Sequence, residues 1–401
     1  MRRLFQGGTV VAPDGAMTVA DVVVEGDRIL DVGSNLDGDE VVDVAGKHLL
    51  PGLFDCHIHL GFSHIDFVKL ARTPPGLLYY EALDGLQKTI DCGITTVRDG
   101  GGADLGMKLA VENGIIPGPR MHIAIGMLSQ TGGHGDGHLH GGGNMFPESS
   151  DAFPKSVIDG PEEARKAVRE MVRAGADVLK VATSGGVLSP DDDPKHAHFQ
   201  PDELEMMAAE ARAAGIFMMA HAQAYDGIKN AIRAGFRSID HGIYLDDEAI
   251  ELMLEHGTWL VPTLLAPQGV IKAAETGVPI PPASVEKARE VIGVHIESVT
   301  KAVAAGVKVA MGTDCPVSPH GTNLGELELM MECGMTAGQA LYATTQSGAD
   351  VMGLGDDLGS IEPGKIADLV VVGGDPLDFS NLKDNIERVW KAGQPLELTA
   401  G

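Results

Sequence analysis

The stretch Pro51-Gly52-Leu53-Phe54-Asp55-Cys56-His57-Ile58-His59-Leu60 decides how the rest of the chain is interpreted. Leu49 and Leu50 lead into it, which predicts a β-strand with buried surroundings. His57 and His59 are two residues apart, and residues i and i+2 of a strand point to the same side. Two imidazoles therefore converge on one point, as a chelated metal ion requires. The alternative is a strand with two incidental histidines, so other parts of the chain must supply further ligands.

The composition is that of a globular protein, with 401 residues of which 44% are hydrophobic and 22% are charged. Asp and Glu total 57 against 30 Lys and Arg, a formal net charge of −27. This excess of negative charge argues against nucleic acids and anionic membrane surfaces as partners. The N-terminus has no apolar signal segment, and no run reaches the ~18 apolar residues of a membrane span. The four cysteines form no C-x-x-C pair, so we expect a cytoplasmic protein without disulfides.

The two ends of the chain both predict short strands. In residues 1–50, turns such as Pro13-Asp14-Gly15 separate β-branched runs such as Asp21-Val22-Val23-Val24-Glu25. Near the other end, the turn-rich segment 359–365 precedes the strand-like run 367–372. We therefore expect one small β-domain built from residues 1–50 and 358–401, flanking a different domain at 51–357.

The middle of the chain alternates between apolar strand-like runs and amphipathic helical patterns. Helical periodicity is clearest at 162–174, 201–214 and 286–305. The eight strand candidates are 53–59, 95–99, 121–125, 178–183, 217–222, 238–242, 259–264 and 307–313. This alternation predicts a parallel α/β sheet, and eight repeats predict a closed (β/α)₈ TIM barrel. The long segments 127–160 and 265–285 are predicted to be functional loops.

Polar residues recur where the predicted strands end, which is where the sites of such barrels lie. They are His57 and His59 on the first strand, Lys180 on the fourth, His221 on the fifth, His241 on the sixth and Asp314 after the eighth. A single buried histidine is usually a structural residue. Agreement between five strand ends predicts instead that these six side chains form one metal site.

Lys180 is the most informative member because it lies inside an apolar strand. A buried lysine is unfavourable unless it is paired or chemically changed, and burial lowers its pKa. A neutral amine can add CO₂, and the resulting carbamate has two oxygens that can bridge two cations. The alternative is a structural lysine paired with a carboxylate.

These residues resemble the amidohydrolase superfamily. The resemblance is carried by the 51–59 run with the four ligands after it, by Gly93-Ile94-Thr95-Thr96-Val97-Arg98-Asp99, and by the segment 358–371. It spans nearly the whole chain and implies a (β/α)₈ barrel with a β-sandwich formed by both termini. A lysine on strand four is similar to the two-metal subtype of this family.

The resemblance implies a ligand set. His57 and His59 would hold the more buried divalent ion with Asp314, His221 and His241 would hold the second, and N6-carboxylated Lys180 would bridge the two. Imidazole-rich ligation with bridging oxygens favours zinc. Two such cations would convert a bridging water to hydroxide, and Asp314 would accept its proton and pass it to the leaving amine. Asp55 and Asp240 are candidates to orient the ligands because they are adjacent to them in sequence.

Loops resemble a narrower group, the imidazolonepropionase-related dipeptidases, which include prolidase-like enzymes and Xaa-Arg or Xaa-Lys carboxypeptidases. The matching segments are 129–136 with His134, 184–190, and His221-Ala222-Gln223-Ala224-Tyr225. The implied substrate is a small molecule, a dipeptide or N-acyl amino acid. His134 would reach its carbonyl and Tyr225 its carboxylate. The alternatives are a surface histidine cluster with His138 and His140, and a packed aromatic residue.

Other functions stay open at this point. A different amidohydrolase would open a cyclic amide, cleave a carbamate or remove an aromatic acyl group from an amino acid. Lys180 argues against a one-metal deaminase, and the presence of all six ligands argues against a non-catalytic scaffold. No arginine is identified for the substrate carboxylate, because Arg98 belongs to a structural motif and Arg237 lies toward the other end of its strand. The family also leads us to expect a homo-oligomer.

Overall fold

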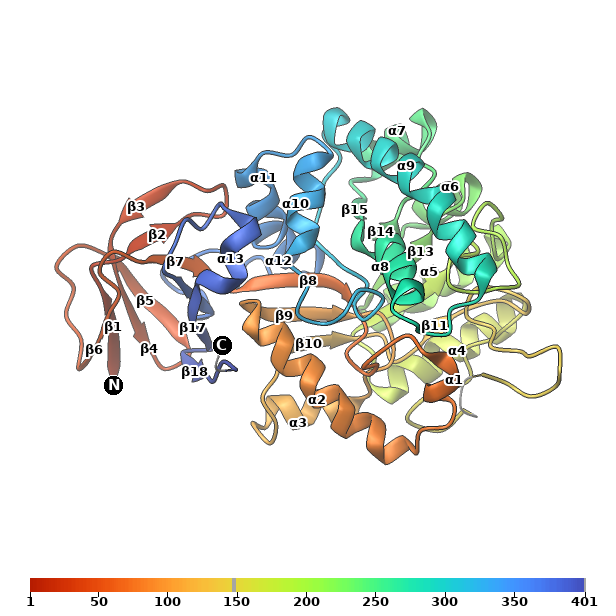
Figure 1. Cartoon of the computed structure of the whole chain (residues 1–401), viewed down its shortest axis with the longest axis horizontal. Helices are drawn as coiled ribbons and strands as arrows, with labels where there is room; N and C mark the ends of the chain where they lie inside the picture. The colour runs from red at the N-terminus through yellow and green to blue at the C-terminus, as the bar shows by residue number, and fades with distance from the viewer. Residues whose placement is uncertain (146–148, 400–401) are drawn as a thin grey trace.

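The computed structural model describes residues 1–145 and 149–399. It has a β-rich part, which contains both chain ends, and a larger α/β part built from the middle of the sequence (Figure 1). In the portion of the chain that is described, no helix is both long and apolar enough to cross a membrane.

The β-rich part contains two sheets. One has the strand order β5-β4-β1-β6 and the other β18-β17-β16-β7-β2-β3. Their bounds are β1 Arg2–Gln6, β2 Thr9–Val11, β3 Met17–Val19, β4 Asp21–Glu25, β5 Arg28–Gly33, β6 Glu40–Asp43, β7 His48–Pro51, β16 Leu369–Val372, β17 Ile386–Lys391 and β18 Gln394–Leu396.

Strands from both termini share the six-stranded sheet, because β16 pairs antiparallel with β7 and places Leu369 opposite Pro51. Phe5 and Ile29 of one sheet pack in one hydrophobic cluster with Leu369 and Trp390 of the other. Strands from both ends of the chain therefore lie together in one β-rich part. Residues 400 and 401 of the expected segment 358–401 lie outside the described residues.

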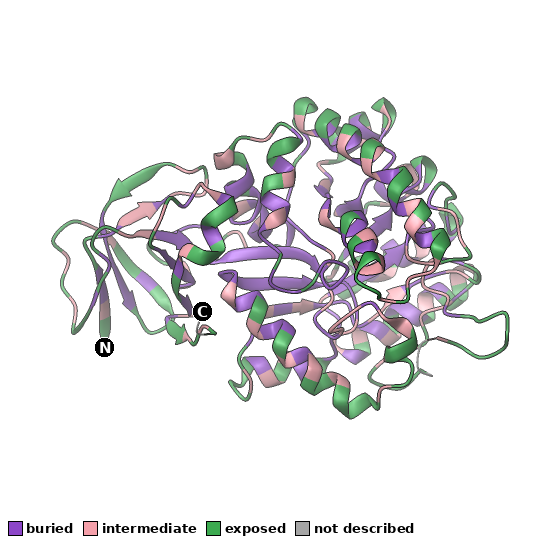
Figure 2. Ribbon diagram, viewed as in Figure 1, coloured by how far each residue is buried: buried purple, intermediate pink, exposed green. Residues whose placement is uncertain are grey.

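The α/β part contains two parallel sheets, with orders β10-β9-β8 and β11-β12-β13-β14-β15. Their bounds are β8 Leu53–Ile58, β9 Ile94–Asp99, β10 Arg120–Ile123, β11 Met127–Leu128, β12 Val178–Ala182, β13 Phe217–Ala222, β14 Ser238–His241 and β15 Trp259–Val261. Seven of the eight predicted strands are therefore present. Every residue of β8 and of β12 is buried, as expected for strands covered on both faces (Figure 2).

The eighth predicted strand, 307–313, is wrong as a regular strand, because it makes isolated bridges instead. On one side the Ala310 N–H donates to the Leu260 carbonyl (2.9 Å), and on the other the Cys56 N–H donates to the Met311 carbonyl (2.8 Å). The ladder is interrupted because the Met311 N–H donates to Ala343. This segment still lies between β15 and β8 and joins the two sheets, an arrangement consistent with a TIM barrel.

Helices cover the sheets with their buried faces inward (Figure 2). Their bounds are α1 Phe67–Leu70, α2 Pro75–Asp91, α3 Leu105–Glu112, α4 Gly160–Ala174, α5 Pro201–Ala214, α6 Tyr225–Ala234, α7 Asp247–His256, α8 Leu265–Glu275, α9 Pro282–Ala305, α10 Gly325–Glu332, α11 Ala337–Ala343, α12 Gln346–Val351 and α13 Phe379–Asn385. The three predicted helices correspond to α4, α5 and α9.

The prediction of a long loop at 265–285 is wrong, because α8 occupies its first half. Pro267 is tolerated there since it lies in the first turn, where its missing N–H removes no helix hydrogen bond. The Glu326 carboxylate accepts from the Leu264 and Leu265 N–H groups (2.7 and 2.9 Å) and caps the helix start. The other expected loop, 127–160, contains β11 and isolated bridges; its residues 146–148 lie outside the described residues.

Gly52 marks the crossing from the β-domain to the barrel. A Cβ there would overlap the Thr95 hydroxyl and lie 2.8 Å from the Asp368 Cβ, so no side chain fits. We expect Gly52→Ala to lower the free energy of unfolding by about 1–3 kcal/mol, measured by urea denaturation. Gly76→Ala is the control, since a Cβ at Gly76 meets nothing within 4 Å. Equal stability of the two variants would contradict the assigned close approach.

Candidate metal centre

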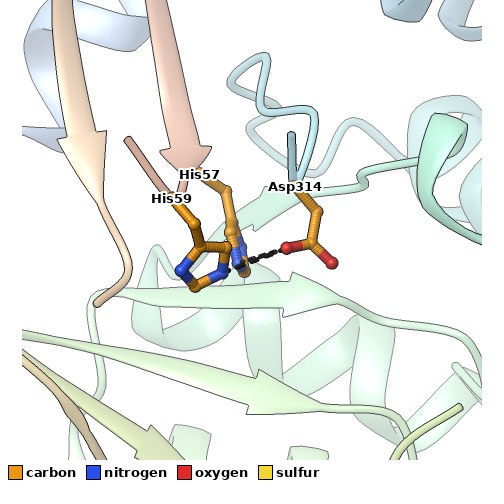
Figure 3. A group of neighbouring side chains, drawn as sticks. All are labelled: His57, His59 and Asp314. Atoms are coloured by element: carbon orange, nitrogen blue, oxygen red, sulfur yellow. Dashed lines mark ion pairs between the residues drawn. The ribbon is translucent and has the colours of Figure 1, made fainter. Parts of the chain in front are cut away.

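Three of the predicted ligands converge at the ends of β8 and of the irregular eighth segment. His57, His59 and Asp314 each place one possible ligand atom within 4.8 Å of the other two (Figure 3). The Asp314 Oδ1 lies 3.1 Å from the His59 Nε2 and 3.5 Å from the His57 Nε2. The i, i+2 spacing of the two histidines does bring both imidazoles to one point.

Both imidazoles are oriented through their other nitrogen. The His57 Nδ1 lies 2.9 Å from the Asp240 Oδ2, and the His59 Nδ1 lies 2.7 Å from the Gly101 carbonyl oxygen. Acceptors on Nδ1 keep a proton there, so Nε2 is the nitrogen of each ring that is left for a ligand. An outer partner on each ligating histidine is typical of metal sites.

Asp55 and Asp240, the two aspartates adjacent to predicted ligands in sequence, contact different groups. Asp240 contacts the His57 imidazole directly. Asp55 is turned away from the imidazoles and accepts from the His57 N–H (3.1 Å), the Thr313 hydroxyl (2.6 Å) and the Asn323 amide (2.9 Å). Asp55 therefore fixes the backbone of the ligand-bearing segments rather than a ring.

Lys180 is fully enclosed at the same place. Its Nζ lies 3.1 Å from the His57 Nε2 and 3.6 Å from the Asp240 Oδ2. Burial lowers the pKa of the Lys180 ammonium to about 8, against the opposing effect of Asp240 and Asp314. The amine is thus far easier to deprotonate than that of an ordinary lysine. Asp240 is also near enough to be the carboxylate partner of a structural lysine, which is the alternative interpretation.

His221 and His241 lie beside these groups on β13 and β14, with their ring centroids 4.5 Å apart. The His241 Nδ1 lies 2.7 Å from the Thr263 hydroxyl, and its buried Nε2 has no hydrogen-bond partner. The His221 Nε2 lies 3.3 Å from the Gly185 carbonyl oxygen, which leaves Nδ1 for a ligand. A buried nitrogen without a partner is costly, so the His241 Nε2 fits a metal ligand better than a packed core residue.

The protonation states of His57, His221 and His241 suit metal binding. Burial lowers the pKa of His57 to about 4 and holds the pKa of His221 and of His241 well below the usual range. These imidazoles are therefore neutral at physiological pH, which is the form that binds cations. Four imidazoles with a carboxylate and a buried lysine form a donor set that fits one or more divalent ions.

Arg98 is structural, as expected from its motif. Its Nε donates to the Cys56 carbonyl (2.6 Å), and its Nη2 lies 3.2 Å from both Asp240 carboxylate oxygens. It thereby fixes the carboxylate that orients His57. Arg237 donates to the carbonyls of Asp350 and Val351, away from the candidate centre.

His134 stacks on His221, with ring centroids 4.1 Å apart and an interplanar angle of 16°. Its Nδ1 lies 2.7 Å from the Ser189 hydroxyl and 3.4 Å from the Asp192 Oδ2. This contact joins the Gly-rich loop to the loop after β12. Tyr225, at the start of α6, is 44% exposed and lies against Tyr244, so it does not share the buried cluster.

Two residues that hold this loop were not identified from the sequence. The Lys287 Nζ on α9 donates to the carbonyls of Gly186 (3.2 Å), Ser189 (2.8 Å) and Asp192. Asp192 lies in a run of three aspartates that is typical of a solvated turn. Lys287 resembles an ordinary lysine on the surface of a helix. Neither carries a local signal of its role.

Comparison with known proteins adds four findings. A sequence model of the amidohydrolase family matches residues 48–396. An ochratoxinase from Aspergillus niger is 35% identical over 366 residues, which cover 86% of this chain and 75% of that protein. Among solved structures, a prolidase complexed with N-methylphosphonate-L-proline is 35% identical with a TM-score of 0.92 over 100% of both chains. A Xaa-Pro dipeptidase with methionine bound in its active site is 32% identical with a TM-score of 0.90, over 99% of this chain and 100% of that one.

Asp240→Asn should weaken metal binding about 10- to 100-fold, because the amide no longer holds the His57 Nδ1 proton as an anion does. Metal per folded chain after dialysis against graded zinc measures this. Asp104→Asn is the control: Asp104 is also buried, but it caps α3 by accepting from the Met107 N–H. Unchanged zinc affinity in Asp240→Asn would show that Asp240 does not orient a ligand.

Proposed function

The chain belongs to the amidohydrolase family of metal-dependent enzymes, and on this basis we propose that it hydrolyses the amide bond of dipeptides or N-acyl amino acids that end in a free carboxylate. The observation that carries the proposal is the buried cluster of His57, His59 and Asp314, with Lys180 and the unpartnered His241 Nε2 beside it. Relatives at 32 and 35% identity that are named as a dipeptidase and a prolidase support the substrate class.

We assign the six side chains to two divalent ions, with zinc as the best match to the donor set. His57, His59 and Asp314 would hold one ion, and His221 and His241 would hold the other. A carbamate on Lys180 would supply oxygen ligands to both; it would form when the neutral Nζ attacks the carbon of CO₂ and the proton leaves to solvent. The lowered pKa of the buried Lys180 makes that neutral amine accessible.

Divalent ions bound by such ligands lower the pKa of water and polarise a carbonyl group. The protein's own contribution centres on Asp314. Although burial alone would raise the pKa of its carboxyl, His57 and His59 lower it to about 2, so the carboxylate is ionised at neutral pH. In the proposed reaction Asp314 accepts the proton of the attacking water and delivers it to the leaving amine.

His134 and Tyr225 are the proposed substrate contacts. His134 is fixed over His221 by Ser189 and Asp192, so it is presented to the centre as an oriented ring. Tyr225 follows the end of β13, and its exposure leaves the hydroxyl accessible to a substrate carboxylate. The Xaa-Pro dipeptidase and the proline phosphonate complex favour proline as one accepted C-terminal residue.

A second candidate is removal of an aromatic acyl group from an amino acid. The 35% identity to an ochratoxinase favours it. The same cluster would perform both reactions, so the two differ only in what the surrounding loops admit.

A substrate panel tests the proposal. Zinc-reconstituted protein is given Xaa-Pro, Xaa-Arg and Xaa-Lys dipeptides, N-acyl amino acids including ochratoxin, and a cyclic amide. Each dipeptide is paired with its C-terminal amide as a matched control. We expect turnover of a carboxylate-ended substrate and a fall of about 10²-fold or more for its amide, because a site built for a charged group discriminates strongly. Hydrolysis of the cyclic amide alone would contradict the proposal.

Asp314→Asn should lower kcat by about 10²- to 10⁴-fold while zinc stays bound, because the amide cannot accept the proton. Zinc content and kcat are measured on the same preparation. Full turnover with bound zinc would remove Asp314 from the proposed role.

Lys287→Met should raise KM about tenfold, because a loosened 184–192 loop misplaces His134. Zinc content should not change. Lys301→Met on the same helix is the control, since the one ion pair that Lys301 forms among the described residues joins it to Glu297 (2.8 Å). If both variants keep the KM of the unmodified protein, the loop does not position a substrate contact.

A further inference from the structure

The backbone at the end of β14 is held in an unusual conformation. His241 has φ +74° and Thr263, which contacts its imidazole, has φ +53°. Left-handed backbone is unfavourable for a residue with a Cβ, and it is rare for a β-branched residue such as threonine. Such a conformation persists only where the surroundings hold it, and it concentrates at functional sites.

A second buried histidine holds His241 from the helical layer. His295 lies on α9 and is 1% exposed, and its Nε2 lies 2.9 Å from the His241 carbonyl oxygen. A carbonyl oxygen only accepts, so the His295 Nε2 donates its proton to it. This hydrogen bond joins helix α9 to the backbone carbonyl of His241.

The imidazole end of His241 is fixed independently. The Thr263 hydroxyl lies 2.7 Å from its Nδ1, and Glu326 on α10 holds the turn after Thr263 through the Leu264 and Leu265 N–H groups. His241 is therefore held at its carbonyl by one helix and at its ring by a turn that a second helix anchors. The buried Nε2 of His241 has no hydrogen-bond partner.

We propose that His295 is a positioning residue for the metal centre, which keeps His241 in its left-handed conformation and thereby aims the His241 Nε2 at the second ion. The inference rests on the proposed function in one respect, since it takes His241 as a ligand. When the bond from His295 is removed, the strain at His241 is no longer opposed, the backbone relaxes toward an ordinary conformation, and the imidazole leaves the site.

The same face of α9 supplies a matched control. Ser298 lies one turn beyond His295; it donates to the Ile243 carbonyl (2.8 Å) and accepts from the Leu245 N–H (3.2 Å). It is buried like His295 and holds the same loop, but it does not contact His241. Ser298→Ala therefore removes a helix-to-loop clamp of similar kind without touching the proposed ligand.

The test uses the full chain with zinc, and with cobalt as a spectroscopic probe. His295→Met removes the donor at similar size, and His295→Gln restores an N–H near the position of Nε2. We expect His295→Met to weaken the second zinc about 10- to 100-fold, as loss of an outer partner does, and to change the visible spectrum of bound cobalt. His295→Gln and Ser298→Ala should keep both the affinity and the spectrum.

The possible results distinguish failure of the inference from failure of the proposed function. Equal zinc affinity and cobalt spectra in the unmodified protein and His295→Met would overturn the inference, as would an equal loss in Ser298→Ala. If His295→Met does not fold, His295→Asn, whose amide is too short to reach the carbonyl, carries the same expectation. Binding of two ions without hydrolysis of any amide would contradict the proposed function and leave the inference standing.

Discussion

The candidate centre depends on one constraint: a hydrogen-bond partner on one nitrogen of each buried imidazole leaves the other nitrogen for a ligand. His57 and His59 are tied through Nδ1 to Asp240 and to the Gly101 carbonyl, and His241 is tied through Nδ1 to Thr263. In each ring the remaining nitrogen faces the centre. The geometry of the candidate site therefore depends on the hydrogen-bond partners behind these imidazoles.

These acceptors also explain how the wider fold serves the site. Arg98 crosses from β9 to the Asp240 carboxylate and to the Cys56 carbonyl, so it links the strand that carries His57 to the strand that carries His241. Helix α9 contacts the end of β14 through His295, and helix α10 contacts the segment after β15 through Glu326. Removing one charge from such a buried network leaves another uncompensated, which makes the network a unit rather than a sum of pairs.

Much of this could be predicted from the sequence, for stated physical reasons. Alternating apolar runs and amphipathic helices predict the parallel α/β fold, and turn-rich ends predict the terminal β-domain. Polar residues at the ends of five of the eight predicted strands predict one site, and His57, His59 and Asp314 do converge. The irregular eighth segment and helix α8 were missed, because backbone bonding to Ala343 and the cap from Glu326 are tertiary contacts. His295, Asp192 and Lys287 were also missed, since nothing local separates them from ordinary buried or surface residues.

The central claim is that six side chains from five strand ends enclose two divalent ions bridged by carboxylated Lys180. Anomalous X-ray scattering at the zinc edge, from crystals grown with zinc and bicarbonate, tests it most directly. The account predicts two anomalous peaks within the set formed by His57, His59, Lys180, His221, His241 and Asp314, with density for a carbamate on the Lys180 Nζ between them. A single peak, peaks outside this set, or an unmodified Lys180 paired with Asp240 would contradict it.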